Sequence, residues 1–279
     1  MQQGLSHTAV STVATLNKAS KKLATGLLAL TAAMAMSASH AKEWKEIRIA
    51  TDATYPPFES VAPDGSLVGF EMDYARALCE EMKVKCVISN PGWDALIPGL
   101  NARKFDAVMA SMNITDDRLK AVDFSDVYYR MKNQFVAASG SNIEISKDGL
   151  KGKNIVVQTG TPQENFVREQ FGDVAHISGY VKADEPFLDL QSGRADLTFG
   201  NKVQIDEGFL KKPGGEKFGF VGPVYDGRDY PVLGRGVAVA MRKNEAELKA
   251  MFNTAIQSLK EKGITKQLQA KYFDYDLSE

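Results

Sequence analysis

Short apolar runs alternate with amphipathic stretches along most of this chain. "KEIRIA", "KCVISN", "FDAVMASM", "KNIVVQTG" and "ADLTFGN" have the pattern of strands, and "FDAVMASM" is apolar on both faces. "FEMDYARALCEEMK", "TPQENFVREQF" and "NEAELKAMFNTAIQSLKEKG" have the periodicity of amphipathic helices. This alternation predicts an α/β fold with mostly parallel sheets, in which strands are buried on both faces and helices flank them.

Two segments of the chain resemble each other. "LNARKFDAVMASM" and "LQSGRADLTFGN" both place a leucine, an arginine and then an aspartate that opens an apolar strand. The spacing from Leu100 to Asp106 equals the spacing from Leu190 to Asp196. We therefore expect two similar α/β lobes, although the shared segment is too short to establish an internal duplication.

The N-terminal region has the pattern of a secretory signal peptide. Lys18, Lys21 and Lys22 precede the apolar stretch "LATGLLALTAAMAMSASHA", and the small residues Ser39 and Ala41 lie three and one positions before the expected cut. The alternative is a membrane anchor, but the apolar run is shorter than the roughly 20 residues that a span requires. We predict that residues 1–41 are removed after Ala41 and that a soluble protein is exported.

Composition excludes several classes of function. The chain has 279 residues and a formal net charge of -1, without a basic block of the kind that binds nucleic acid. Removing residues 1–41 also removes two histidines and leaves His176. A metal site built from several histidines, or a catalytic triad without His176, is then excluded. We expect no metal ion, no cofactor and no nucleic-acid partner.

Cys79 and Cys86 are the two cysteines of the chain, in "LCEEMKVKC". Their spacing differs from that of a redox CxxC motif, and two thiols alone rarely hold a metal. In an oxidising compartment, a lone close pair is a disulfide by default. We predict a structural disulfide between a helix end and the following strand.

Polar side chains follow several of the predicted strands. "MASMNITDDR" passes from an apolar strand end to small polar residues, two acids and an arginine. In open α/β sheets, ligands bind beyond the carboxyl ends of the strands. The candidate ligand-binding residues at these ends are Asp52, Tyr55, Trp93, Ser111, Asn113, Arg118, Thr161, Gln163 and Asn201.

Arg118 and the segment from Thr161 are candidates for binding an anion. The fork-shaped guanidinium of Arg118 matches a carboxylate. Thr161 is a good N-cap, Pro162 suits the first helical position and Glu164 completes a capping box, so backbone N–H groups would face the sheet edge. Two simpler roles remain open, namely an ion pair between Arg118 and Asp117 and a helix cap with nothing bound.

Asp52, Tyr55 and Trp93 are candidates for the other end of a ligand. Asp52 could oppose a cation, and the two aromatic rings could enclose the body of the ligand. The simpler alternatives are an aspartate that forms a local turn and aromatic residues that belong to the core.

Taken together, these motifs resemble the periplasmic solute-binding proteins for polar amino acids, closest to the lysine/arginine/ornithine-binding and histidine-binding branch. The resemblance extends in order over nearly all of residues 44–277. It is carried by "TDATYPPF", "GFEMDYARALCEEMKVKC", "WDALIPGLNARKFDAVMASMNITDDR", "VDFSDVYY", "LKGKNIVVQTGTPQE", "EGFLKKPG", "FVGP" and "KYFDYD".

The resemblance implies a type II fold with two lobes joined by two crossover strands that act as a hinge. The implied boundaries are residues 42–132 and 232–279 for the first lobe and 133–231 for the second. It also implies delivery of the ligand to an inner-membrane ABC permease, with a chemoreceptor as a further possible partner. We expect a monomer.

The resemblance also implies roles for individual residues. Arg118 would hold the α-carboxylate of the ligand, with Ser111 and Thr161 as supporting donors and Trp93 and Tyr55 as walls. Asp52 would meet a distal cation. The cysteines match the disulfide of the same branch.

Three positions depart from the family pattern. Asn201 stands where the family usually has an aspartate for the α-ammonium group of the ligand, and an amide keeps an acceptor but loses the charge. Asn113 replaces a small hydroxyl residue, and Pro162 removes a backbone donor. An opine, whose α-nitrogen is substituted, would need the missing acid less than a free amino acid would.

The sequence therefore predicts a binding protein for arginine, lysine, ornithine, histidine or a derivative such as an opine. An alternative on the same fold is an enzyme similar to cyclohexadienyl dehydratase. That enzyme needs an acid or base aimed at the ligand, and Asn201 removes one candidate. A third alternative is a protein that presents its ligand to a chemoreceptor.

Overall fold

The computed structural model describes residues 44–274 and residue 277. The predicted signal peptide and its cleavage site lie outside the described residues, so they stay predictions. Over the described part of the chain, no helix combines the length and the apolar character needed to cross a membrane.

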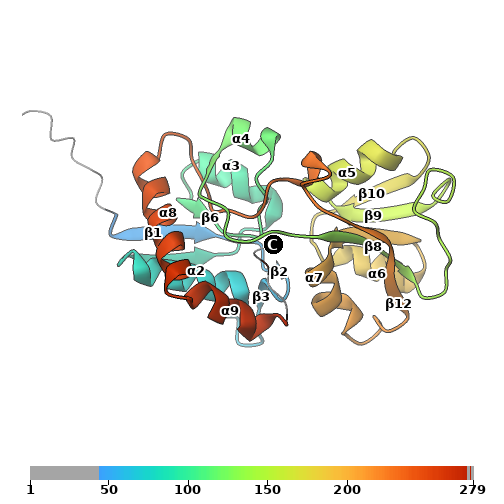
Figure 1. Ribbon diagram of the computed structural model, residues 1–279, viewed down its shortest axis with the longest axis horizontal. Coiled ribbons are helices and arrows are strands. Elements are labelled where there is room, and N and C mark those ends of the chain that lie inside the picture. The colour runs from blue at the N-terminus through green and yellow to red at the C-terminus, as the bar shows by residue number, and fades with distance from the viewer. Residues whose placement is uncertain (1–43, 275–276, 278–279) are drawn as a thin grey trace, which may run out of the picture. The chain divides into compact units, whose positions relative to one another are not determined.

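Residues from both ends of the described chain form the first lobe, which runs from blue at β1 to green at α4 and is red at α8 and α9 in Figure 1. Its five-stranded sheet has the order β5 (Lys85–Ser89), β1 (Glu46–Ala50), β6 (Ala107–Val108), β13 (Ala240–Met241) and β7 (Asp123–Phe124). The helices are α2 (Phe70–Glu81), α3 (Leu96–Asn101), α4 (Asp116–Ala121), α8 (Ala246–Glu261) and α9 (Ile264–Tyr272). Ile47 and Ile49 of β1 join the hydrophobic cluster that includes α2 and α8, whereas Ala50 joins the cluster that includes α3. Apolar side chains therefore cover both faces of this sheet, as the sequence predicts.

The middle of the chain forms the second lobe, which is green to orange in Figure 1. Its sheet has the order β10 (His176–Tyr180), β9 (Asn154–Gln158), β11 (Leu197–Asn201), β8 (Asn133–Ala138) and β12 (Phe218–Tyr225). The helices are α5 (Pro162–Phe171), α6 (Glu185–Ser192) and α7 (Lys202–Ile205). Val157 packs with Phe166 of α5, and Val156 belongs to the cluster that includes Leu190 of α6. Adjacent residues of β9 thus bury opposite faces of the sheet.

Short elements complete the fold. A small antiparallel sheet contains β2 (Thr54–Tyr55), β3 (Glu59–Val61) and β4 (Leu67–Val68). Single turns of 3-10 helix lie at η1 (Trp93–Ala95) and η3 (Pro231–Leu233), and η2 (Asp206–Leu210) is a short π-helix.

The two large sheets have matching topology. The chain crosses to the second sheet between β7 and β8 and returns between β12 and β13. In each sheet the three strands at one end are parallel, and the arriving strand, β8 or β13, is antiparallel to both of its neighbours. Four of the five strands in each sheet therefore share a direction, but the sheets are mixed, because the first strand after each crossing, β8 or β13, runs against the other four.

The two similar segments, at residues 100–106 and 190–196, lie at equivalent places in the two lobes. The carboxylate of Asp106, just before β6, accepts from the backbone N–H of Arg48 at 3.1 Å. The carboxylate of Asp196, just before β11, accepts from the backbone N–H of Asn154 at 2.8 Å. Both aspartates therefore join the start of one strand to its parallel neighbour.

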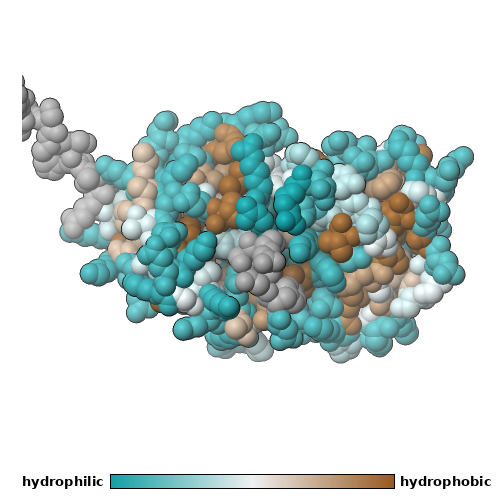
Figure 2. Space-filling view, in the orientation of Figure 1, coloured by the Kyte–Doolittle hydropathy of each residue, from teal (hydrophilic) through white to brown (hydrophobic). Residues whose placement is uncertain are grey.

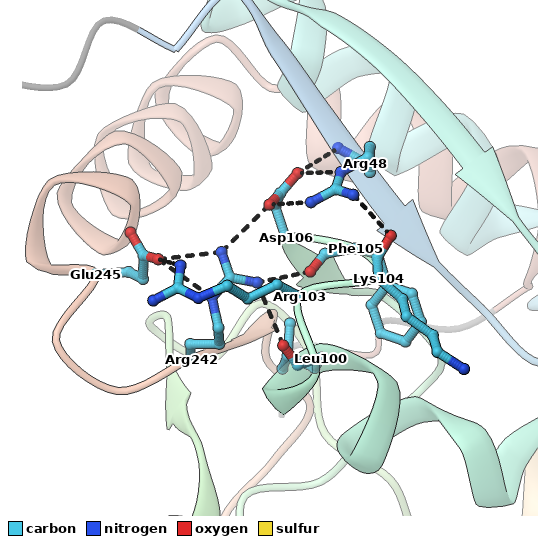
Figure 3. A network of polar contacts seen from close by, with 8 residues as sticks. All are labelled: Arg48, Leu100, Arg103, Lys104, Phe105, Asp106, Arg242 and Glu245. Atoms are coloured by element: carbon cyan, nitrogen blue, oxygen red, sulfur yellow. Dashed lines mark hydrogen bonds and ion pairs between the residues drawn. The ribbon is translucent and has the colours of Figure 1, made fainter.

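Asp106 is also the centre of a larger polar network (Figure 3). Nε and Nη2 of Arg48 donate to its carboxylate at 2.9 Å, and Nη2 of Arg242 donates at 3.2 Å. Arg242 also donates to the carbonyl oxygen of Phe105 at 2.6 Å and pairs with Glu245 at 3.0 Å. The network fixes β1, β6 and the segment before α8 at the end of the sheet opposite to the strands' carboxyl ends.

The predicted disulfide is present. Cys79 and Cys86 are bonded, with 6.1 Å between their Cα atoms, and they connect α2 to β5. The face of the protein in Figure 2 is mostly hydrophilic, with small separate hydrophobic areas.

Candidate functional site

A cavity lies between the lobes, at the carboxyl ends of β1, β6 and β9. This is the edge at which ligands bind in open α/β sheets. Side chains from both lobes line the cavity: Asp52, Tyr55, Glu59, Trp93, Ala110, Ser111, Asn113, Arg118, Met131, Gln158, Thr161, Pro162 and Gln163.

Eight of the nine residues selected from the sequence line this cavity, and Asn201 is the exception among the described residues. Asn201 is buried at the end of β11. His176 is exposed at the start of β10. No group of histidine, cysteine and acidic residues suitable for a metal ion is found in residues 44–274.

Arg118 is buried without a carboxylate partner in the described structure. Its Nη1 donates to the carbonyl oxygen of Asn113 at 2.9 Å, and its Nη2 donates to that of Gly160, in the other lobe, at 3.2 Å. The alternative pair with Asp117 does not form, because Asp117 pairs with Lys120 at 2.7 Å. Burial lowers the pKa of Arg118 to about 10. A buried cation with this environment is a strong site for an anion.

Trp93 covers one side of the Arg118 guanidinium. The guanidinium carbon lies 5.2 Å from the ring centroid, within the range of a cation–π contact. Gly160 lies against the same indole, where an added Cβ would be 3.4 Å from Nε1. Gly160 also has a φ of +67°, which favours glycine. Trp93 and Gly160 thus hold the guanidinium between the lobes.

Thr161 caps α5 as the sequence predicts. Its Oγ1 accepts from the N–H of Glu164 at 3.1 Å and donates to the carbonyl oxygen of Gln158 at 2.7 Å. The N–H of Gly160 donates to Glu164 at 2.8 Å. The hydroxyl is therefore committed to the cap, so a donor to a ligand at this position would have to be the backbone N–H of Thr161.

Asp52 lies where the two lobes meet. Its carboxylate accepts from Thr54 Oγ1 at 3.1 Å and from Nε2 of Gln158, in the second lobe, at 3.3 Å. The N–H of Ala183 adds a further contact between the lobes by donating to Thr54 at 3.3 Å. Burial raises the pKa of Asp52. Asp52 therefore makes a local contact with Thr54, as a turn residue would, and also lines the cavity, as a ligand-binding residue would.

Sequence reasoning missed five lining residues, and Glu59 is the most consequential. Glu59 is 1% exposed in β3, whereas Val61 of the same strand is 53% exposed. Hydrophobicity alone predicts a buried valine and an exposed glutamate, so the sequence pattern of this strand does not indicate that Glu59 is buried. Gln158 could have been selected, because it is the last residue of a predicted strand. The others are Ala110, Met131 and Pro162.

A second compartment adjoins the first. The two share Tyr55, Gln158, Thr161 and Gln163. The remaining wall belongs to the second lobe and comprises Ala183, Pro186, Phe187, Thr198, Phe199, Gly200, Gln204 and Ile205. The site therefore continues along the second lobe beyond the cavity that Arg118 and Asp52 line.

The amide of Asn201 is oriented by α7. Its Oδ1 accepts from the backbone N–H groups of Val203 at 2.8 Å and Gln204 at 3.1 Å. Because these two donors fix the oxygen, the amide nitrogen must point the other way. That nitrogen and Nε2 of Gln204 are buried without a partner among the described residues. The expectation that Asn201 offers an acceptor to a ligand is therefore wrong for this structure, in which its free group is a donor.

Comparison with known proteins agrees with this arrangement. A match to the bacterial extracellular solute-binding proteins, family 3, extends over residues 47–275. The chain belongs to this family. It is 39% identical over 254 residues to the L-arginine-binding protein of Pseudomonas aeruginosa, covering 90% of this chain and 97% of that protein.

Two further relatives support the same relationship. The lysine/arginine/ornithine-binding periplasmic protein of Escherichia coli is 37% identical over 258 residues, covering 92% of this chain and 98% of that protein. The solved structure of an ancestral arginine-binding protein bound to arginine has a TM-score of 0.76 and 31% identity, covering 84% of this chain and all of that one. The two-lobe fold of this family is thus established for the chain.

Proposed function

We propose that this protein is the periplasmic substrate-binding component of an ABC transporter for basic amino acids. Arginine, lysine, ornithine and histidine are the candidate ligands. The names of its relatives, an L-arginine-binding protein and a lysine/arginine/ornithine-binding periplasmic protein, support this class. Both names describe binding proteins, which supports a binding role over a dehydratase.

The observation that carries the proposal is the charge distribution around the cavity. Arg118 is a buried cation without a carboxylate partner in the described chain, and Asp52 and Glu59 are acids in the same cavity wall. A basic amino acid supplies both complements, a carboxylate for Arg118 and a cationic side chain for the acids. In a poorly hydrated cavity, both contacts are weakly screened by salt.

The expected mechanism is closure of the two lobes around the ligand. We place the lobe boundaries at residues 42–132, 133–231 and 232–279, so that the two crossing segments form the hinge. Closure would present a surface made by both lobes to an inner-membrane permease. A chemoreceptor could recognise the same form of a monomeric protein.

A derivative with a substituted α-nitrogen is a second candidate ligand. The compartment beyond the amino-acid cavity is lined by Gln204, whose amide nitrogen is buried without a partner among the described residues, and this favours an extension that carries a hydrogen-bond acceptor. Opines such as octopine and nopaline have such an extension. Asn201→Asp would keep the two acceptor bonds that cap α7 and would remove the donor, so affinity should shift from opines toward free basic amino acids.

A thermal-shift screen tests the proposal, because a ligand that binds the folded form raises the apparent stability. The panel contains arginine, lysine, ornithine, histidine, glutamine, octopine and nopaline, and product formation from prephenate and arogenate is assayed in parallel. A selective shift with basic amino acids or opines supports the proposal. No shift with any of them, or formation of product, would reject it.

A further inference from the structure

A chain of hydrogen-bonded oxygen atoms runs from the cavity wall into the first lobe. Oε2 of Glu59 lies 3.1 Å from Ser111 Oγ, and Ser111 Oγ lies 2.8 Å from Tyr129 Oη. Tyr129 Oη lies 2.8 Å from Oε1 of Glu71, which Tyr128 Oη also contacts at 2.8 Å. All five side chains are buried. Glu59 and Ser111 line the cavity, and the other three side chains lie behind them.

The number of protons in this chain can be counted. It has four links, Glu59 to Ser111, Ser111 to Tyr129, Tyr129 to Glu71 and Tyr128 to Glu71, and each link needs one proton. The hydroxyl groups of Ser111, Tyr128 and Tyr129 provide three, since each carries a single hydrogen. The fourth proton must belong to a carboxyl group. With every one of the four links occupied by a proton, Glu59 and Glu71 share one proton and carry one negative charge between them.

The shared proton has two arrangements on the same heavy atoms. In one, Glu59 is the acid: it donates to Ser111, Ser111 donates to Tyr129, and Tyr129 donates to an ionised Glu71. In the other, all three donors reverse, so that Glu71 is the acid and Glu59 is ionised. Moving from the first to the second transfers one proton from Glu59 to Ser111, one from Ser111 to Tyr129 and one from Tyr129 to Glu71. Charge moves to the cavity without any net loss of protons.

The surroundings favour a shared proton over two ionised carboxylates. Burial raises the pKa of Glu59 well above its usual range and raises that of Glu71 to about 7. Two like charges at close range in a buried site cannot readily both be ionised. The ionisable groups around Glu59 are Asp52, Tyr55, Glu71, Tyr128 and Tyr129, with Arg118 in the same cavity wall.

We propose that Glu59 is a specificity residue that contacts the cationic group of the ligand, and that Ser111 and Tyr129 pass its proton to Glu71 when the ligand binds. This inference rests on the proposed binding of a basic amino acid. The free cavity can then hold a neutral Glu59, and an arriving cation draws the negative charge toward itself. Ser111 has a φ of +50°, a rare conformation outside glycine that is found at functional sites.

The first experiment measures the contact of Glu59 with the ligand. Arginine and its neutral isostere citrulline are titrated calorimetrically into wild-type protein, into Glu59→Gln and into Glu80→Gln, which makes the same change at an exposed position of α2. We expect Glu59→Gln to weaken arginine binding roughly tenfold to a hundredfold, as for a lost hydrogen bond to a charged group. Citrulline binding and the Glu80→Gln control should change little. Equal losses for both ligands, or no loss, would overturn the assignment.

The second experiment measures the proton transfer. Arginine binding near neutral pH is measured in two buffers with different heats of ionisation, which reports the number of protons exchanged with solvent. Wild-type protein should release almost none. Tyr129→Phe interrupts the relay, so Glu59 should lose its proton to solvent, with release of up to about one proton and affinity that rises with pH. Tyr272→Phe, whose hydroxyl contacts Asp73 outside the relay, should behave as wild type.

The outcomes separate the two proposals. If Tyr129→Phe does not fold, Ser111→Ala interrupts the same relay and replaces it. Equal proton release by wild type and the interrupted variant would overturn the relay. Failure of wild-type protein to bind any basic amino acid would instead reject the proposed function.

Discussion

Nη2 of Arg118 and the carbonyl oxygen of Gly160 lie 3.2 Å apart, and the two residues belong to different lobes. The guanidinium thus contacts both walls of the cavity directly. The N–H of Gly160 is already bound to Glu164, which fixes the loop that carries this carbonyl group. A carboxylate bound by Arg118 would therefore be held at the junction of the lobes, where it can favour their closure.

Replacing Arg118 by alanine should weaken arginine binding by roughly thirtyfold or more, because loss of one partner of a buried charge pair costs about 2–5 kcal/mol. Calorimetric titration measures the effect. Arg76→Ala is the matched control, since Arg76 is exposed and pairs with Asp73 on α2. If Arg118→Ala binds arginine with near wild-type affinity, the guanidinium of Arg118 does not bind the carboxylate of the ligand.

Replacing Asp52 by asparagine should reduce the affinity for arginine far more than that for citrulline. The amide retains much of the shape and loses the charge that would face the cationic end. Because burial raises the pKa of Asp52, the ionised form is lost at a higher pH than for an exposed aspartate. The affinity of the wild-type protein for arginine should therefore fall as the pH is lowered through the raised pKa of Asp52. An unchanged preference for arginine in Asp52→Asn would leave Asp52 as a residue of the local turn alone.

The positions of most cavity residues could be predicted because strand ends are visible in sequence. Ser111 and Arg118 follow an apolar run, and Thr161 begins a helix with a standard cap. Parallel strands bring such ends to one edge of a sheet. The same reasoning predicted helix-flanked sheets and two similar lobes.

The functional state of individual groups could not be predicted in this way. The burial of Glu59 depends on contacts with Ser111, far away in the sequence. The orientation of the Asn201 amide depends on two backbone N–H groups of α7. The mixed character of the sheets depends on the direction of β8 and β13, the strands that follow each crossing between the lobes. Each of these is a long-range or three-dimensional property that local periodicity does not contain.

The disulfide should be complete in the exported protein. Thiol titration under denaturing, non-reducing conditions should detect no free thiol. Cys79→Ala combined with Cys86→Ala should lower the free energy of unfolding by about 2–3 kcal/mol, the loop-entropy value for so short a loop. The affinity for arginine should be unchanged, because the described cavity walls do not include either cysteine. Two titratable thiols in the wild-type protein would contradict the pairing.

Asp106 and Asp196 occupy equivalent places but should differ in their contribution to stability. Asp106→Ala leaves Arg242, whose side chain is 8% exposed, without one of its two acids, so we expect a loss of about 3 kcal/mol. Asp196 pairs with the half-exposed Lys153, so Asp196→Ala should cost about 1 kcal/mol. Urea denaturation of both variants measures the difference. Equal losses would show that the buried network of Asp106 adds nothing beyond the backbone contact that both aspartates make.

On the proposed function, this cavity recognises a carboxylate and a side-chain cation in one molecule. Calorimetric titration of the wild-type protein with arginine, citrulline and agmatine tests it most directly, because citrulline lacks the side-chain cation and agmatine lacks the carboxylate. Arginine should bind at least roughly tenfold more tightly than either, as expected when one charge-assisted contact is lost from a buried site. Binding of citrulline or agmatine as tight as that of arginine would show that the cavity does not require both charges.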